Sequence, residues 1–195
     1  MNADIRSFFK SILLLVALSL APPAWTAESA PIVSGWVEWV VLEPWGIPLK
    51  GKLDTGAKTS SLHAVDIEYF EREGEEWVRF KTVASPQDSK PLAVERPLVR
   101  DVRIKRHKNA YQKRPVVTLG MCLGDRYTTA EFSLIDRSRF NYPVLLGRRA
   151  LKKKEVLVDA SRTFTLGSDA RRCQQLSQSA RQYNTLAGRT PLVQP

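Results

Sequence analysis

The stretch KLDTGAKTSSLHA, residues 52–64, decides how this chain folds and what it can do. An apolar run leads into Asp54, and Thr55, Gly56 and Ala57 follow it. A carboxylate at a strand end, before a small residue and a glycine, lies where backbone amides can approach it closely. Such a carboxylate can do acid–base chemistry on a bound substrate. The alternative is an Asx-turn, in which Asp54 bonds only to its own backbone.

Short β-strands are predicted on both sides of this stretch. Residues 33–42 and 47–53 are separated by a turn and predict a hairpin that delivers its second strand to Asp54. Further strand signals lie at 61–67, 76–83, 115–119, 126–135, 144–146, 155–158 and 164–166. Only residues 148–153 carry a helix signal. The pattern predicts an all-β fold, either a closed barrel or a sandwich.

The N-terminal segment, residues 1–27, has the order of a secretory signal peptide. Basic residues precede the apolar run 12–21, and prolines and small residues follow it. A cut after Ala27 would leave the bulky Trp25 three positions from the cleavage site, so an uncleaved N-terminal anchor is the alternative. In both cases we expect the remainder outside the cytoplasm, in a bacterial periplasm, with an inner-membrane tether only if the leader is retained.

The rest of the chain divides into one domain and a tail. Residues 32–167 are enough for a single hydrophobic core. Residues 168–195 are basic and poor in apolar side chains, so we expect a disordered tail.

Charge and cysteine content narrow the partners. The formal net charge of +10 favours anionic partners such as acidic peptides, cell-wall polymers or lipid head groups. An exported location makes nucleic acid the least expected of the anionic partners. Cys122 and Cys173 could form a disulfide in an oxidising compartment, or they could be two unrelated thiols.

Two features together resemble the retropepsin-like aspartic proteases: the Asp54-Thr55-Gly56-Ala57 turn, and the late apolar run 144–148 (VLLGR) that enters a helix. The resemblance is closer to a bacterial subgroup historically labelled "ATP-dependent zinc protease". Its motifs occur here in order as KLDTGAKTSSLHA, WVRF, RPVV, FSLIDR and YPVLLGRRAL. The resemblance covers residues 35–166. It implies a retropepsin-like closed β-barrel with one short helix after the late apolar-Gly strand.

The historical label does not fit the residues. A catalytic zinc site needs about three His, Glu, Asp or Cys ligands with suitable spacing. The chain has only His63 and His107, no His-Glu-x-x-His motif and no Gly-x-x-x-x-Gly-Lys loop for nucleotide phosphates. We therefore expect neither a metal nor another cofactor. His63 is interpreted as a packed or surface residue and His107 as solvated.

The resemblance also implies a mechanism and a set of site residues. Aspartic proteolysis needs two carboxylates that share a proton, so one Asp54 per chain implies a homodimer in which two copies face each other. Residues expected to form or support the active turn are Thr55, Gly56, Ala57, Thr59 and Ser60. Asp136 and Asp159 are alternative second carboxylates for a monomer, or they brace the fold by pairing Arg137 or Arg148.

A substrate-covering flap is expected in this fold. The basic segment 102–114 is one candidate and the hairpin at 71–78 is the other. Residues expected to contact substrate are Lys105, Arg106, Arg114, Leu146, Gly147 and Arg148. The positive charges of the basic residues in the flap segment would favour acidic peptides.

The sequence therefore predicts an exported aspartic endopeptidase that works as a homodimer on a peptide or protein. A non-catalytic module that binds anionic peptides or cell-envelope components is the alternative. A structural envelope protein is a third interpretation.

Overall fold

The computed structural model describes residues 30–83, 91–105 and 111–187, and the predicted leader lies outside these ranges. The strands are β1 (Ile32–Glu43), β2 (Ile47–Asp54), β3 (Ser60–His63), β4 (Val65–Arg72), β5 (Glu75–Val83), β6 (Pro91–Pro97), β7 (Arg100–Lys105), β8 (Tyr111–Leu123), β9 (Arg126–Ile135), β10 (Val144–Gly147) and β11 (Val156–Thr163). The helices are α2 (Arg148–Lys153) and α3 (Ala170–Leu186).

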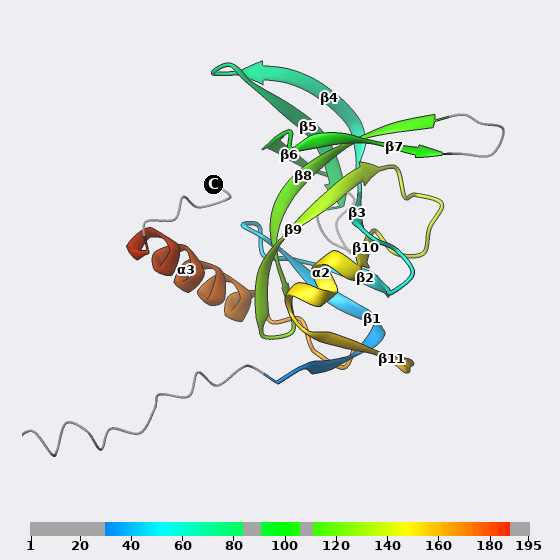
Figure 1. Ribbon diagram of the computed structural model, residues 1–195, viewed down its shortest axis with the longest axis vertical. Helices are drawn as coiled ribbons and strands as arrows, with labels where there is room; N and C mark the ends of the chain where they lie inside the picture. The colour runs from blue at the N-terminus through cyan, green and yellow to red at the C-terminus, as the bar shows by residue number, and fades with distance from the viewer. Residues whose placement is uncertain (1–29, 84–90, 106–110, 188–195) are drawn as a thin grey trace, which may run out of the picture. The chain divides into compact units, whose positions relative to one another are not determined.

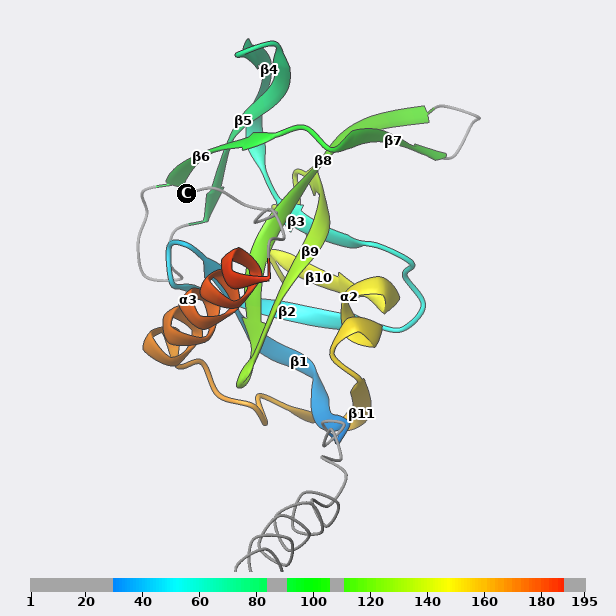
Figure 2. The same cartoon turned by 60° about the vertical axis from the view of Figure 1, so that its left-hand side comes forward.

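A closed barrel forms the body of the molecule (Figures 1 and 2). The large sheet has the order β11-β1-β2-β10-β3-β9-β8-β7, and a second pairing of β1 with β8 closes the strands from β1 to β8 into a ring. The all-β prediction, the retropepsin-like barrel and the short helix after the late strand are confirmed.

The hairpin that leads into Asp54 has the predicted form. β1 and β2 pair antiparallel, from Leu42 with Ile47 to Val37 with Lys52. Along β2 the buried residues alternate with more exposed ones, so Leu49, Gly51 and Leu53 face the interior. Because side chains alternate across a strand, Lys52 and Asp54 lie together on the outer face.

The late strand β10 lies between the strands on either side of the Asp-Thr-Gly turn. It runs parallel to β2, with Gly147 opposite Asp54, and antiparallel to β3, with Leu145 opposite Ser61. This insertion brings residues almost a hundred positions apart in the sequence to the same edge of the site.

The hydrophobic core fills the barrel interior. Phe132, Leu62, Leu146 and Val117 are fully buried there. Burial of apolar side chains on this scale is the main favourable contribution to folding.

A buried carboxylate joins the end of the domain to β1. Glu38 is fully buried, and its Oε1 accepts hydrogen bonds from the amides of Gly35 (2.7 Å) and Thr165 (2.8 Å) and from the Thr165 hydroxyl (2.6 Å). Its Oε2 accepts from the amide of Leu166 at 3.2 Å. A buried carboxylate is tolerated when hydrogen-bond donors surround it in this way.

Two hairpins project from the barrel. β4 and β5 are joined by a two-residue turn in which Glu73 (φ 53°) and Gly74 (φ 79°) are left-handed, as such hairpins require. β6 completes that sheet. β7 and β8 form the second hairpin, an arm that includes the described residues of the basic segment 102–114, one of the two flap candidates.

The prediction of a disordered tail from residue 168 is wrong for residues 170–186, which form α3. The Asp169 side chain caps the helix by accepting from the amide of Arg172 at 3.0 Å. A disulfide joins Cys173 to Cys122 on β8. The composition gave no sign of this helix because a covalent bond, rather than a broad apolar face, fixes it to the sheet.

Candidate active site

The Asp54 carboxylate lies at the end of β2, held by its own turn. Its Oδ1 accepts hydrogen bonds from the amides of Gly56 (2.9 Å) and Ala57 (3.2 Å). A side chain at position 56 would crowd this carboxylate, because a Cβ there would lie 3.1 Å from Oδ1. The side chain of Asp54 stays 25% exposed, so the amides fix its direction without removing it from solvent.

Lys52 contacts the other oxygen of this carboxylate. Its Nζ lies 3.0 Å from Asp54 Oδ2. The hydrogen bond from Lys52 lowers the pKa of Asp54, with a smaller contribution from the Gly56 and Ala57 amides, while partial burial opposes them. The sequence-based set of site residues missed Lys52, although strand alternation already places it on the face of Asp54.

The start of α2 clamps the turn from the other side. Arg148 Nη1 donates to the carbonyl oxygens of Thr55 (2.8 Å) and Gly56 (2.9 Å), and the Arg148 amide donates to the Ala57 carbonyl at 2.9 Å. Arg148, expected to contact substrate, thus supports the active turn.

Gly147 and Ser60 form the next layer of support. The Ser60 hydroxyl accepts from the Gly147 amide at 3.1 Å, and Ser60 is buried. A Cβ on Gly147 would lie 2.6 Å from the carbonyl carbon and oxygen of Thr59, so only glycine allows this contact. Gly147 is therefore a packing residue beneath the turn, and the expectation that it contacts substrate is not supported.

The remaining expected substrate contacts are dispersed. Leu146 is fully buried in the core, which contradicts a surface role. Lys105 ends β7 on the projecting arm, and Arg106 lies outside the described residues. Arg114 on β8 donates to Gln112. Burial lowers the pKa of the Arg137 guanidinium, and the charge of Arg114 lowers it further.

The two alternative carboxylates have other partners than expected. Asp136 accepts from the Ser138 amide (2.8 Å) and lies 3.7 Å from His63 Nδ1. Asp159 accepts from the amide and hydroxyl of Ser161. Within the described residues, neither carboxylate pairs with Arg137 or Arg148, the arginines expected as partners. Both close local turns.

Arg137 is a buried cation near the site. It is 7% exposed, and its guanidinium donates to the Ser61 hydroxyl (2.8 Å) and the Tyr142 carbonyl (3.0 Å). Its amide donates to His63 Nδ1 at 3.0 Å, which explains His63 as a packed residue. Burial lowers the pKa of His63.

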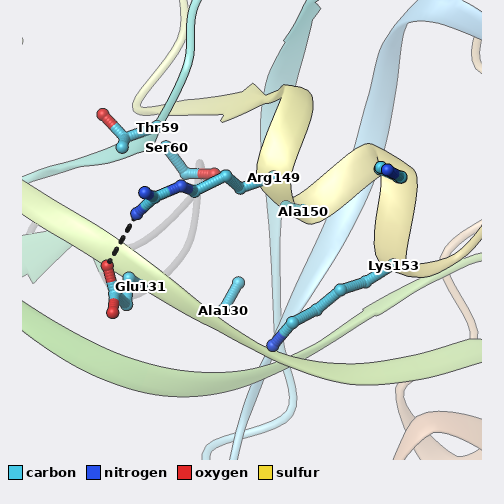
Figure 3. Close-up of a pocket in the computed structure, with 8 residues that line it drawn as sticks. Thr59, Ser60, Ala130, Glu131, Arg149, Ala150 and Lys153 are labelled. Atoms are coloured by element: carbon cyan, nitrogen blue, oxygen red, sulfur yellow. Dashed lines mark ion pairs between the residues drawn. The ribbon is translucent and has the colours of Figure 1, made fainter.

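A pocket of about 470 Å³ lies beside the turn, between α2 and β9 (Figure 3). Ala130 and Ala150 contribute apolar surface to it. Of its three lining cations, Arg149 lies 3.7 Å from Glu131, Lys153 donates to the Thr129 carbonyl at 3.1 Å, and Lys152 is the third, so the pocket identifies no ligand by itself. In the described part of the chain, no three His, Cys, Asp or Glu side chains gather as a metal site would require.

Comparisons with known proteins agree with this geometry. A solved structure of a Legionella pneumophila protein of unknown function matches with a TM-score of 0.62 and 38% identity, covering 71% of this chain and all of that one. A probable alpha-L-glutamate ligase of Shewanella pealeana is 38% identical over 138 residues, and one of Desulfotalea psychrophila is 33% identical over 142. These matches cover 69% and 72% of this chain but only 30% of each relative. The family model described as retropepsin-like aspartic endopeptidase RimB matches residues 33–168, and the chain therefore belongs to the RimB-like family.

Proposed function

We propose that the chain is an exported aspartic endopeptidase that hydrolyses peptide bonds as a homodimer sharing two copies of Asp54. The observation that carries the proposal is a carboxylate oriented by two backbone amides at an exposed strand end. Thr55 and Gly56, which follow it, are exposed in the single chain. They are thus available to contact a second copy of the turn.

The chemistry requires two carboxylates in different protonation states. The ionised Asp54 of one protomer takes a proton from water as the water oxygen attacks the peptide carbonyl carbon. The protonated Asp54 of the partner gives its proton to the carbonyl oxygen. As the tetrahedral intermediate collapses, the C–N bond breaks and the leaving nitrogen takes a proton back. The two carboxylates titrate as one coupled pair.

An acidic peptide is the proposed substrate class. The net charge of +10 and the Lys52 ammonium beside Asp54 support this choice over nucleic acid in an exported protein. The matched relatives carry the name of a glutamate ligase over a far longer chain, which supports glutamate-containing peptides without transferring the ligase activity.

The proposed location is the periplasm, with an inner-membrane tether if the leader is retained. The disulfide between Cys122 and Cys173 supports an oxidising compartment. Among the described residues, neither helix combines the length and apolar character that crossing a bilayer demands.

Cleavage of a peptide library across pH tests the proposal. The protein without residues 1–27 should cleave, and Asp54→Asn should abolish cleavage, while Asp159→Asn should not, because that carboxylate contacts only its near neighbours Ser161 and Arg162 among the described residues. Sedimentation should find a dimer in the active preparation. Cleavage that survives Asp54→Asn, or an active protein that is strictly monomeric, would overturn the shared-carboxylate proposal.

A non-catalytic binding module is the second candidate, and one observation favours it. Both oxygens of Asp54 already accept hydrogen bonds in the single chain, and the hydrogen bond from Lys52 lowers the pKa of this carboxylate. A lowered pKa works against sharing a proton with a second copy of Asp54. Saturable binding of acidic peptides without cleavage at any pH would support this second function.

A further inference from the structure

Lys52 occupies a position that the chemistry of an aspartic dyad does not require. Strand β2 places its side chain on the face of Asp54, two residues away, or about 7 Å along the strand. Its ammonium gives one hydrogen bond to Asp54 Oδ2, and the side chain is 43% exposed. Among the described residues no other hydrogen bond of this ammonium is found, so its remaining donors face solvent.

The neighbours of Lys52 form a surface with apolar and cationic parts. Leu145 of β10 lies opposite Lys52 and also opposite Ser61 of β3, so these three side chains share one face across adjacent strands. Leu145 is only half-buried, whereas Leu146 beside it is fully buried. The row ends at the Ser61 hydroxyl, which accepts from the buried guanidinium of Arg137. The apolar surface of Leu145 beside the exposed ammonium of Lys52 fits the methylenes and the carboxylate of an acidic side chain.

We propose that Lys52 is a specificity-determining residue that binds the carboxylate of an acidic side chain next to the scissile bond. This inference rests on the proposed endopeptidase function. The scissile carbonyl must lie at Asp54, and the Lys52 ammonium is 3.0 Å from that carboxylate. A side chain beside the scissile bond is therefore within reach of Lys52.

The same contact changes the state of Asp54. Without substrate, Lys52 is paired with Asp54 and lowers its pKa. A carboxylate from the substrate competes for this ammonium and adds negative charge nearby, so both effects raise the pKa of Asp54 again. An acidic substrate thereby prepares Asp54 to share a proton with its copy, whereas a neutral substrate leaves the ion pair intact.

Matched peptides measure this selectivity directly. Two pairs of peptides are compared, and the two members of each pair differ only in carrying Glu or Gln at one position. That position is the residue before the scissile bond in one pair and the residue after it in the other. The wild-type protein should favour Glu in one pair by roughly tenfold or more in kcat/KM, the scale of a charge-assisted hydrogen bond. Lys52→Met should reduce this ratio to less than about threefold, and Lys52→Arg should retain most of it.

Lys50→Met is the matched control, because Lys50 lies on the same strand and face but stacks over Trp39 and Phe164. It removes the same charge and should keep the Glu/Gln ratio of the wild type. If Lys50→Met lowers the ratio as much as Lys52→Met, the effect is long-range charge and the inference fails.

The pH profile separates recognition from support of the fold. Because Lys52 lowers the pKa of Asp54, Lys52→Met should move the acid limb of kcat on the Gln peptide to higher pH. A merely structural lysine would lower cleavage of both peptides equally and leave the profile in place, which would overturn the inference.

Two controls keep the results distinct. Circular dichroism checks that Lys52→Met folds. If it does not, peptide binding is measured with the single variant Asp54→Asn and with the double variant Asp54→Asn/Lys52→Arg, which gives the Glu/Gln ratio without cleavage. Equal affinities for the Glu and Gln peptides overturn the inference. Cleavage by the wild type with no Glu preference in either pair refutes Lys52 recognition alone. Absence of Asp54-dependent cleavage of every peptide refutes the proposed function, and the inference falls with it.

Discussion

Replacing Gly147 by alanine should disturb the site without removing any polar group. The added Cβ would lie 2.6 Å from the carbonyl carbon and oxygen of Thr59 and 2.8 Å from its nitrogen. Contacts below 3.0 Å are essentially never formed by real Cβ atoms, and the obstacle here is backbone rather than a flexible side chain. Either β10 or the segment that follows the Asp54 turn must therefore move.

The structure sets the size of the effect. Overpacking a well-filled interior costs about 1–3 kcal/mol, and we expect the upper end because two backbone segments collide. A displacement approaching ~1 Å near reacting groups costs on the order of 10²-fold in rate. Gly147→Ala should thus lower the free energy of unfolding by about 3 kcal/mol and kcat by on the order of 10²-fold.

Urea denaturation and peptide cleavage measure both effects. Gly74→Ala is the control, since it is also a glycine-to-alanine change but has no atom within 4 Å of the new Cβ. Its φ of 79° still carries a strain cost of about 1 kcal/mol. If Gly147→Ala is no less stable than Gly74→Ala and its kcat is unchanged, the proposed close contact with Thr59 does not hold.

Three further predictions concern stability. Reducing the Cys122–Cys173 disulfide opens a loop with a sequence separation of 51, so the free energy of unfolding should fall by about 4 kcal/mol in urea titrations, and α3 should lose amide protection from hydrogen exchange. Arg96 is buried with Nε and Nη2 unpaired and stacks on Trp45, so Arg96→Met should cost less than about 1 kcal/mol or should stabilise. Burial lowers the pKa of His63, so the unfolded chain takes up its proton first, and stability should fall as pH drops below about 6.5.

Each of these predictions has its own control. A Cys122→Ala/Cys173→Ala double variant should match the reduced protein and should not respond to reductant. Arg137→Met should cost more than Arg96→Met, because the two are equally buried but Arg137 leaves two hydrogen-bond partners behind, on Ser61 and Tyr142, whereas Arg96 leaves one, the Glu95 carbonyl. If Arg96→Met lowers the free energy of unfolding more than Arg137→Met does, the idea that a buried cation with unpaired donors costs stability is contradicted. His63→Gln should flatten the pH dependence, and an unchanged slope would assign it to other groups.

Much of the fold was predictable because it depends on local patterning. Alternation in residues 33–53 predicted the β1–β2 hairpin, and the apolar run at 144–146 predicted β10. The turn after Asp54 could also be predicted, since glycine and a small residue permit amides to reach a carboxylate. Binary pattern and turn chemistry act over a few residues, so one sequence is enough to read them.

The site residues depended on strand order, which the sequence does not state. Only the insertion of β10 between β2 and β3 shows that Leu145 shares a face with Lys52, while Leu146 points into the core. The same insertion makes Arg148 a support for the turn. A shift of one residue in register would exchange these roles, because side chains alternate from one face to the other.

By itself, the sequence determined an all-β chain with a carboxylate held in a glycine turn at the end of an apolar strand. The tertiary structure decided that Arg148 supports the turn after Asp54, that Gly147 is required by the backbone of Thr59, and that α3 is fixed to β8. The physical reason is the range of the interactions. Alternation and turn preferences are local, whereas the Arg148 hydrogen bonds, a backbone contact and a disulfide depend on which distant segments the barrel brings together.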